Sequence, residues 1–271
     1  MIDPPTPMIA VSGVRKRLDG VDVLGDVDLE IARGELVALS GPSGSGKTLL
    51  LKAIIGLIEP DSGSIRIDGR ETVGVAPAAR EAATRRIGML FQRSALFDSM
   101  PVWENVVFRS LAEGSLDRSS GFEAAVEKIA AVGLAPETAA LYPADLSGGM
   151  QKRAALARAI ADDPEILLLD EPTAGLDPIM SNVINDLIRE TASRLDATVL
   201  LVTSDMAGAR RTTDRFAMMH AGSVVWQGPT DSIGDSGNAF VDRFVHRRAD
   251  GPVGTLADTV GSDELPETRA T

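Results

Sequence analysis

The chain has 271 residues, of which 44% are apolar, and it carries a formal net charge of −12. This length is enough to bury one large core, or a core with a smaller attached unit. The acidic balance opposes nonspecific attraction to phosphodiester backbones, so we expect no nucleic-acid partner. Because the chain has no cysteine, disulfides and thiolate metal sites are excluded, which favours a reducing compartment.

Membrane and export signals are not apparent in the sequence. No apolar run approaches the roughly 18 residues that a membrane-spanning helix needs, and no secretory signal opens the chain. We therefore expect a protein that neither spans a membrane nor is exported by that route.

The first predicted elements are antiparallel strands within residues 8–31, where apolar and polar positions alternate. A short apolar strand follows over 35–40, and a helix is predicted over 49–58. The residues between them have the order of a phosphate-binding loop: Gly, four residues, then Gly-Lys-Thr. They are Gly41, Pro42, Ser43, Gly44, Ser45, Gly46, Lys47 and Thr48.

The glycines of this loop permit backbone turns that direct successive N–H groups toward phosphate oxygens, in front of a helix N-terminus. Lys47 adds a positive charge at the β- and γ-phosphates, and Thr48 places its hydroxyl on Mg²⁺. The sequence therefore predicts that the chain binds ATP together with Mg²⁺. The alternative is a glycine-rich turn without a ligand.

A helical region follows the next apolar strand, which is predicted over 86–91. Segments 101–112, 122–132 and 136–141 have apolar residues at helical spacing and little strand character. We expect these segments to form a smaller helical subdomain over about 97–150.

Leu146-Ser147-Gly148-Gly149 opens a further run of good helix formers, Met150 to Ala161, so Ser147 is predicted to cap this helix. A cap alone needs no pair of glycines. Bare backbone N–H groups and a serine hydroxyl at a helix start form a second anion site. Because one chain cannot direct both helix starts at one phosphate, the motif pair predicts an ATP site divided between two copies. The alternative is that Ser147 only caps its helix.

The strand predicted over 166–170 is an apolar run that ends in two carboxylates, Asp170 and Glu171. The C-terminal ends of parallel strands are where ligands bind in open α/β sheets. Asp170 is suited to hold Mg²⁺, and Glu171 is suited to accept a proton from water attacking the γ-phosphate. The alternative is a solvated acidic turn.

The last elements are a buried strand over 198–203, two short strands over 215–220 and 224–228, and a helix over 238–246. The alternation of apolar strands with helices predicts the α/β class, with a doubly wound and mostly parallel central sheet. After residue 248 the composition becomes acidic and rich in Gly, Pro and Thr. Such a segment has little to bury, so 249–271 is predicted to be a flexible extension, or alternatively a docking arm.

The phosphate loop, the Leu146-Ser147-Gly148-Gly149 motif and Asp170-Glu171 together resemble the ATP-binding-cassette (ABC) ATPases. The resemblance extends over about residues 8–248. It implies a P-loop NTPase cassette over 1–248, with an N-terminal antiparallel β subdomain and a helical subdomain. In that family the Ser-Gly-Gly signature of one subunit closes over the nucleotide held by the other, which implies a homodimer.

Further site residues are implied by the same resemblance. Gln92 occupies the position whose amide reaches Mg²⁺ or the attacking water and senses the membrane partner. Asp177, in Ala174-Gly175-Leu176-Asp177, matches the loop that crosses the dimer seam. The alternative for both is an ordinary surface residue.

Two positions depart from the family pattern. Ser204 stands where a histidine usually touches the γ-phosphate, and its shorter, uncharged hydroxyl predicts slow hydrolysis without loss of ATP binding. Leu18 stands where an aromatic side chain usually stacks on adenine, which predicts modest affinity for the base.

The segment 88–106 resembles the ATPase subunit of Mla-type transporters, which move phospholipid with lipid-binding MCE proteins, and so do 146–161 and 249–253. This resemblance implies integral membrane permease subunits, an MCE partner and a peripheral location at the cytoplasmic face of the inner membrane. An apolar surface that receives a permease helix is predicted from four residues, unless these pack the helical subdomain instead. They are Phe97, Met100, Pro101 and Trp103.

Three alternatives to lipid transport follow from the same residues. The cassette energises an importer of amino acids or another polar solute, or it is a nucleotide-responsive regulator with weak hydrolysis, which Ser204 favours. A soluble ABC protein of DNA repair or translation is the third. It is disfavoured because the sequence shows neither a long coiled-coil insertion nor a second cassette.

Overall fold

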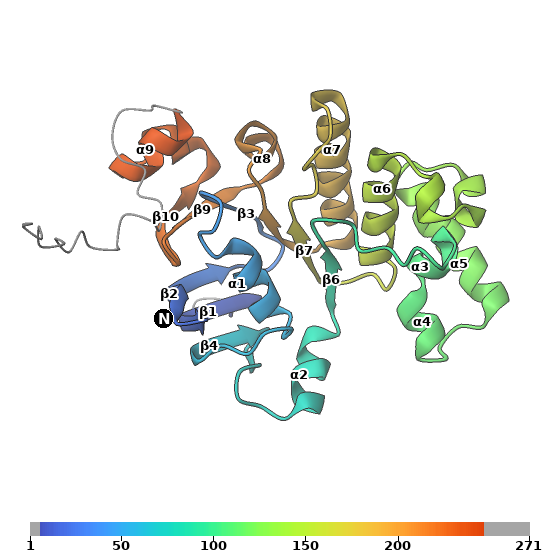
Figure 1. Cartoon of the computed structure of the whole chain (residues 1–271), viewed down its shortest axis with the longest axis horizontal. Helices are drawn as coiled ribbons and strands as arrows, with labels where there is room; N and C mark the ends of the chain where they lie inside the picture. The colour runs from blue at the N-terminus through green and yellow to red at the C-terminus, as the bar shows by residue number, and fades with distance from the viewer. Residues whose placement is uncertain (1–5, 247–271) are drawn as a thin grey trace, which may run out of the picture.

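A computed structural model describes residues 6–246 of the chain. The predicted boundary at 248 and the extension 249–271 lie outside the described residues. In Figure 1 the strands form the middle of the molecule, and most helices between residues 100 and 160 gather at one end.

The central sheet has six strands in the order β10-β9-β3-β8-β7-β6. Five of them are parallel, and β10 is the antiparallel edge strand. The strands are β3 (Leu36–Ser40), β6 (Ile87–Leu90), β7 (Ile166–Asp170), β8 (Thr198–Val202), β9 (Arg215–His220) and β10 (Ser223–Pro229). Every residue of β3, β7 and β8 is buried, because helices or a second sheet cover both faces.

The register of these parallel strands positions the site. Leu90 pairs with Leu169, and Asp170 pairs with Val202. The carboxyl ends of β6, β7 and β8 therefore lie next to one another, and the residues that follow each strand emerge at the same edge of the sheet.

A second, antiparallel sheet has the order β2-β1-β4-β5. Its strands are β1 (Ile9–Leu18), β2 (Val21–Ile31), β4 (Ser62–Ile67) and β5 (Arg70–Glu71). The antiparallel strands predicted within 8–31 are confirmed, whereas β4 and β5 were not predicted. Helix α1 (Lys47–Ile54) and residues from both sheets share one apolar core.

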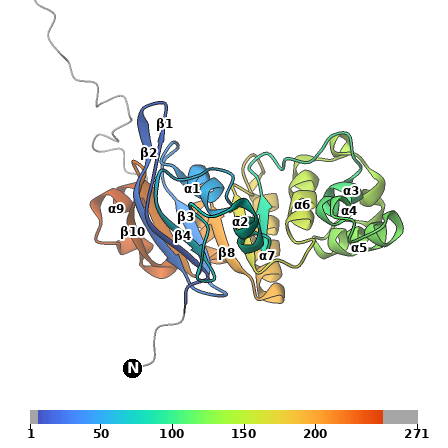
Figure 2. The same ribbon diagram turned by 90° about the horizontal axis from the view of Figure 1, so that it is seen from below.

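The region beyond residue 100 is helical, as predicted. Its elements are α3 (Val102–Val106), α4 (Phe108–Ala112), α5 (Arg118–Ala131), the 3₁₀ helices η1 (Pro136–Ala140) and η2 (Pro143–Asp145), and α6 (Gly148–Ala159). The helix predicted over 101–112 is divided at Val107, the one predicted over 136–141 is a 3₁₀ helix, and η2 was not predicted. Figure 2 shows them side by side at the end away from β1 and β2. Residues of α3, α5 and α6 share a core with β7 and with α7 (Pro178–Leu195).

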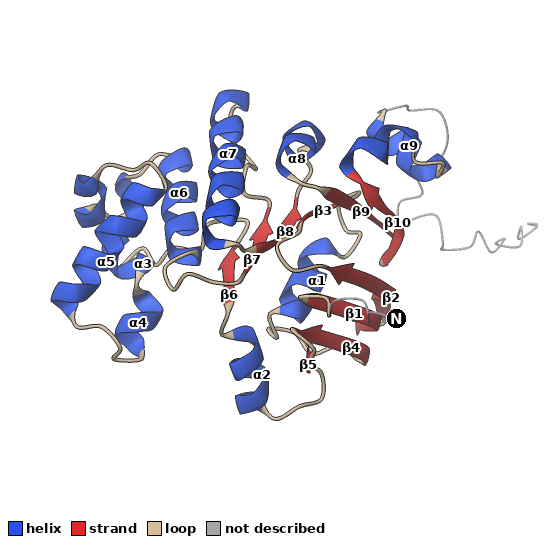
Figure 3. Cartoon of the chain, turned by 180° about the vertical axis from the view of Figure 1, so that it is seen from behind, coloured by secondary structure: helices blue, strands red, loops and turns tan. Residues whose placement is uncertain are grey.

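The remaining helices complete the layers. Helix α2 (Pro77–Thr84) precedes β6, and α8 (Met206–Thr212), η3 (Thr230–Asp235) and α9 (Ala239–Val245) follow β8 and β10. A third core lies between α8, α9 and the strands β3 and β9. Figure 3 shows the two sheets in red with α1 close to both. The α/β class, with a mostly parallel sheet, a separate antiparallel sheet and a helical layer, is confirmed.

One predicted surface residue is buried. Trp103 is only 8% exposed, and its ring meets Phe122 edge-on at 5.7 Å while the Arg118 guanidinium lies 4.9 Å from the ring centroid. The expectation that Trp103 lies on an exposed docking surface is therefore wrong, because α5 covers its ring. Phe97, in contrast, is 43% exposed.

Candidate nucleotide site

The loop between β3 and α1 takes turns that only glycine permits without strain. Gly41 has φ 142° and Gly46 has φ 100°. A Cβ at Gly41 would lie 2.1 Å from the carbonyl oxygen of Met219, and one at Gly46 would lie 2.8 Å from that of Val23. The loop thus packs closely on its neighbours and turns into α1, whose N-terminus receives no side-chain cap from the described residues. Such a helix start is suited to bind an anion.

Lys47 is buried in this loop as a cation held by backbone oxygens. Its Nζ donates to the carbonyl oxygens of Gly41 at 2.8 Å and Pro42 at 2.7 Å. Burial lowers the pKa of the Lys47 ammonium, and the nearby carboxylates of Glu171 and Asp170 oppose that shift. Among the described residues no carboxylate forms an ion pair with it. Its charge is therefore available to an anion in the loop.

Thr48 and Asp170 bring two oxygen ligands together from different elements. Thr48 Oγ1, in the first turn of α1, donates to Asp170 Oδ1 at the end of β7 at 3.2 Å. Burial raises the pKa of Asp170, and the Thr48 hydrogen bond opposes this. Hydroxyl and carboxylate oxygens suit Mg²⁺, which takes its other ligands from phosphate and water. The part of the chain that is described holds no group of three or more His, Cys, Asp and Glu around a metal position. Thr48 and Asp170 would hold the ion, which neutralises charge on the phosphates.

Glu171 and Ser204 are in direct contact. Glu171 has a left-handed φ of 46°, and its N–H donates to the carbonyl oxygen of Val202 at 2.8 Å. The backbone N–H and the hydroxyl of Ser204 each donate to Glu171 Oε2 at 3.1 Å. The sequence predicts Ser204 near the γ-phosphate, and the structure adds a contact with the carboxylate next to that position.

Gln92 lies two residues after β6, with an exposed side chain. Its carbonyl oxygen accepts a hydrogen bond from Lys152, a buried lysine of α6 that also donates to the carbonyl oxygen of Glu171. Lys152 was not predicted to be a site residue. Helical spacing could have indicated that it is buried, because Lys152 shares a helix face with Leu156 and Ala159, which are both buried.

Ser147 is the N-cap of α6, as predicted, and its hydroxyl accepts from the N–H of Met150 at 3.3 Å. Ser147 and Gly148 are exposed, and no hydrogen bond within the described chain joins them to the phosphate loop. The single chain therefore does not place the Leu146-Ser147-Gly148-Gly149 motif on its own Lys47.

Asp177 and Leu18 have local roles in the single chain. The Asp177 carboxylate caps α7 by accepting from the N–H groups of Ile179 at 2.9 Å and Met180 at 3.0 Å. Leu18 lies at the end of β1, pairs with Val21 and is 41% exposed. Their roles toward a partner and toward adenine stay predictions.

Known proteins resemble this chain in both sequence and fold. The family model described as ABC transporter matches residues 24–174. The chain is 37% identical over 246 residues to the probable ribonucleotide transport ATP-binding protein mkl of Mycobacterium tuberculosis, covering 91% of the chain and 68% of mkl. It is 38% identical over 262 residues to the chloroplastic protein TRIGALACTOSYLDIACYLGLYCEROL 3 of Arabidopsis thaliana, covering 91% and 75%.

Two further comparisons bear on substrate and on assembly. The chain is 41% identical over 251 residues to the phosphate import ATP-binding protein PstB 2 of Natronomonas pharaonis, covering 88% of the chain and 86% of that protein. Its fold matches a dimeric ATP-binding cassette in a post-hydrolysis state bound to ADP and Pi. The TM-score is 0.76 at 31% identity, and the match covers 82% of the chain and 99% of the cassette. The chain therefore belongs to the ABC transporter family, as an ATP-hydrolysing cassette.

Proposed function

We propose that two copies of this chain enclose two ATP molecules, and that hydrolysis at the two sites powers a membrane transporter. The observation that carries this is the convergence of Lys47, Thr48, Asp170 and Glu171 at one sheet edge, while Ser147 of the same chain forms no hydrogen bond with the phosphate loop in the described residues. A second copy supplies the missing Ser147 to each site. The dimeric form of the matched cassette supports this arrangement.

Within each site we assign one task to each residue. Lys47 binds the β- and γ-phosphates and stabilises the charge that develops on them. Glu171 accepts a proton from the attacking water, and Ser204 holds the Glu171 carboxylate in place through its two hydrogen bonds. The side chain of Gln92 orients the water.

ATP-dependent dimerisation tests the shared site. In the Glu171→Gln background, which slows hydrolysis, ATP with Mg²⁺ is expected to convert monomer into dimer in size-exclusion chromatography with light scattering. Ser147→Arg is expected to prevent the dimer, because a bulky cation occupies the place of the partner's phosphate, while ATP binding to the monomer persists. The matched control is Ser119→Arg, at an exposed position of α5. A Ser147→Arg protein that dimerises as readily would contradict the shared site.

The permease surface that we propose combines Phe97 with residues that the sequence analysis did not select. The rings of Phe97 and Phe108 are 4.7 Å apart between centroids, and both are exposed. Phe108 and the exposed Leu57 line a groove of 220 Å³ between β6, α4 and the end of α6. An apolar exposed patch beside a groove suits a partner helix.

Asn105 gives this surface a defined shape. Its buried amide accepts from the N–H of Phe97 at 2.7 Å and donates to the carbonyl oxygens of Phe97 at 3.1 Å and Met100 at 3.0 Å. The loop that carries Phe97 is therefore held from inside.

Within the described residues no helix is both long and apolar enough to cross a bilayer. Because the proposed partners are integral permease subunits, we propose a peripheral location at the cytoplasmic face of the inner membrane.

For the cargo we propose phospholipid or another hydrophobic lipid, delivered with an MCE-type partner. The likeness of segment 88–106 to Mla-type ATPases supports this, and so does the 38% identity to a relative that is named after a galactosylated diacylglycerol. The test is to purify the tagged chain with its membrane partners and identify bound lipid by mass spectrometry. Copurification of an MCE protein with enriched phospholipid is the expected result. A permease that copurifies with a soluble solute-binding protein and no lipid would contradict it.

A polar-solute importer is the second candidate, because the chain is 41% identical to PstB 2, whose name describes phosphate import. A regulator with weak hydrolysis is the third, and Ser204 is the residue that favours it. Phosphate release by the assembled complex separates this third candidate from a pump, since a regulator shows no stimulation when its membrane partners are added.

A further inference from the structure

Helix α6 touches the catalytic edge of the sheet at a point away from its own N-terminus. It packs against β6 and carries two basic side chains that reach the segment after that strand. Lys152 donates to the carbonyl oxygen of Gln92, and Arg158 donates to those of Ser94 and Ala95 at 2.6 Å each. The backbone after β6 is therefore held from α6.

Lys152 also reaches the next strand. Its Nζ donates to the carbonyl oxygen of Glu171 at 3.2 Å, so one ammonium joins the segments that follow β6 and β7. The side chain is 6% exposed, and within the described residues it forms no ion pair with a carboxylate. Burying a cation that contacts only carbonyl oxygens lowers the stability of the fold. Such a lysine is therefore better explained by a role in the site than by a contribution to stability.

Two opposing effects act on the pKa of this lysine. Burial lowers the pKa of Lys152, while the negative charges of Asp170 and Glu171 oppose the shift and favour the ammonium. Lys128 on α5 provides a contrast, because its ammonium lies in a surface ion pair with Asp163. Lys152 has no such structural partner, and its two acceptors belong to the backbone of two proposed site residues.

The segment after β6 depends on these contacts for its shape. Ser94 and Ala95 have left-handed φ values of 61° and 51°, which residues other than glycine rarely adopt. Their carbonyl oxygens are those that Arg158 holds. The segment that carries Gln92 is thus a strained turn fixed by α6.

We infer that Lys152 is a positioning residue for hydrolysis, which holds the backbone of Gln92 and Glu171 at a set separation and ties both to α6. The inference rests on the proposed roles of Gln92 and Glu171. Since Ser147 is the N-cap of α6, a movement of this helix that brings Ser147 onto a partner's nucleotide also moves Lys152. The contact with the partner is thereby linked to the geometry of the chain's own catalytic carboxylate.

The test substitutes Lys152→Met, which retains an unbranched apolar side chain of nearly the same length and removes the charge and the donors. Turnover of ATP by the full chain is expected to fall roughly ten- to a hundredfold, because a small misplacement of reacting groups is that costly. The KM for ATP is expected to change less than about twofold, since no contact with the nucleotide is removed. Lys152→Arg retains a cation and is expected to recover part of the turnover.

A second readout needs no nucleotide. Amide hydrogen exchange of the segments 91–97 and 170–174 is expected to become faster in Lys152→Met, while exchange in β3 stays unchanged. Lys128→Met is the matched control, because it removes a lysine from the same helical layer, and its turnover and exchange are expected to equal those of the unmodified chain. If Lys152→Met does not fold, Lys152→Gln, which retains a donor on a shorter side chain, is measured in the same way.

Three outcomes decide the matter. Unchanged turnover in Lys152→Met would overturn the inference, and so would a loss of turnover without faster exchange in the two segments. Lower turnover at constant KM together with faster exchange supports it. Gln92→Ala and Glu171→Gln are measured in parallel. If neither lowers turnover, the proposed roles fail, whereas a loss in these two with none in Lys152→Met removes the positioning role alone.

Discussion

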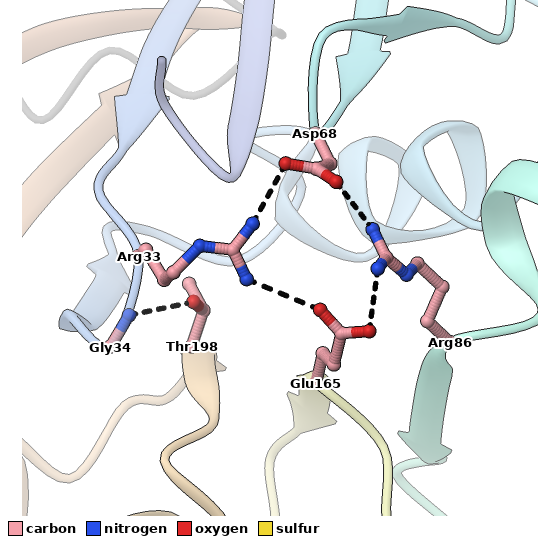
Figure 4. A network of polar contacts seen from close by, with 6 residues as sticks. All are labelled: Arg33, Gly34, Asp68, Arg86, Glu165 and Thr198. Carbon is pink, nitrogen blue, oxygen red and sulfur yellow. Dashed lines mark hydrogen bonds and ion pairs between the residues drawn. The ribbon is translucent and has the colours of Figure 1, made fainter. Parts of the chain in front are cut away.

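The two ends of the central sheet use charge in opposite ways. At the N-terminal ends of the strands, Arg33, Asp68, Arg86 and Glu165 form a closed ring of ion pairs, in which each guanidinium contacts both carboxylates (Figure 4). Beside it, the N–H of Gly34 donates to Thr198 Oγ1 at 2.9 Å, which adds a contact between the start of β8 and the turn before β3.

At the C-terminal ends the charges are not matched in this way. Lys47 and Lys152 contact only neutral oxygen atoms, Asp170 accepts from a hydroxyl, and Glu171 accepts from Ser204. In this ring every charged group already has a partner of opposite charge. The ring therefore contributes to the fold and leaves no unpaired charge for a ligand. Buried charges that are held by neutral groups remain free for a charged ligand. We therefore interpret one end of the sheet as structural and the other as the proposed catalytic end.

The largest expected difference between the two ends of the sheet is obtained by neutralising one carboxylate at each end and measuring ATP turnover. Glu171→Gln is expected to lower ATP turnover by about 10²- to 10⁴-fold, because the amide cannot accept a proton from water. The dissociation constant for ATP is expected to stay within about twofold. Phosphate release and equilibrium binding of a fluorescent ATP analogue provide the two measurements.

The matched control is Glu165→Gln, which alters the ring at the other end. Its turnover is expected to equal that of the unmodified chain. Equal losses in the two variants would show that the distinction between the ends is wrong.

The next effect in size concerns Ser204. A hydrogen bond to a charged group is worth about 1.5–3 kcal/mol, which corresponds to roughly ten- to a hundredfold in rate. Ser204→Ala removes the hydroxyl donor and leaves the backbone donor, so the loss of turnover is expected near the lower limit, with unchanged ATP affinity. Single-turnover phosphate release measures it, and Ser232→Ala, remote from the sheet edge, is the control. Turnover that matched the control would leave Ser204 without a chemical role.

Much of the catalytic end was predictable because buried parallel strands are continuous apolar runs. The strands β3, β7 and β8 were predicted from the sequence. Lys47 was identified by the phosphate-loop pattern after β3, Asp170 and Glu171 by their place at the end of β7, and Ser204 by the resemblance to the ABC ATPases. The strand β4 was missed because it begins with Ser62, Gly63 and Ser64, which have no strand character by themselves.

Tertiary contacts were harder to predict than strand ends. The acceptors of Lys152 are backbone carbonyls on two other elements, and nothing in the pattern of side chains indicates them. Trp103 was misassigned for a similar reason, since only the packing of α5 decides that its ring is covered. The ion-pair ring likewise joins residues from four separate turns and strand starts.

A smaller effect is expected at the edge of the nucleotide site. Leu18→Tyr supplies the aromatic ring that stacks on adenine. Stacking is worth about 1–3 kcal/mol per base, and the exposed position of Leu18 favours the lower value. ATP is expected to bind roughly fivefold more tightly, which isothermal titration calorimetry detects. Val21→Tyr, on the paired residue of β2, is the control. An unchanged dissociation constant would refute the assignment of Leu18 to the base.

The smallest effect is expected for Asp68 in the ion-pair ring. The direction in which stability changes as the pH falls follows from the pKa shift of this residue. The hydrogen bond from Arg86 lowers the pKa of Asp68, with the charges of Arg33 and Arg86 acting in the same direction. The folded protein therefore binds this proton less readily than the unfolded chain does. The stabilisation from Asp68 is present above the ordinary aspartate pKa and is lost as the pH falls through the lowered value.

Asp68→Asn removes that contribution, which is about 1 kcal/mol or less in the free energy of unfolding because the ring is partly exposed and screened by salt. Urea unfolding at neutral pH is expected to show this small loss, and the gap between the variant and the unmodified chain is expected to close as the pH is lowered. ATP turnover at neutral pH is expected to stay the same. A large loss of turnover in Asp68→Asn would mean that the paired ring acts on the catalytic end across the sheet, and that the two ends are not independent.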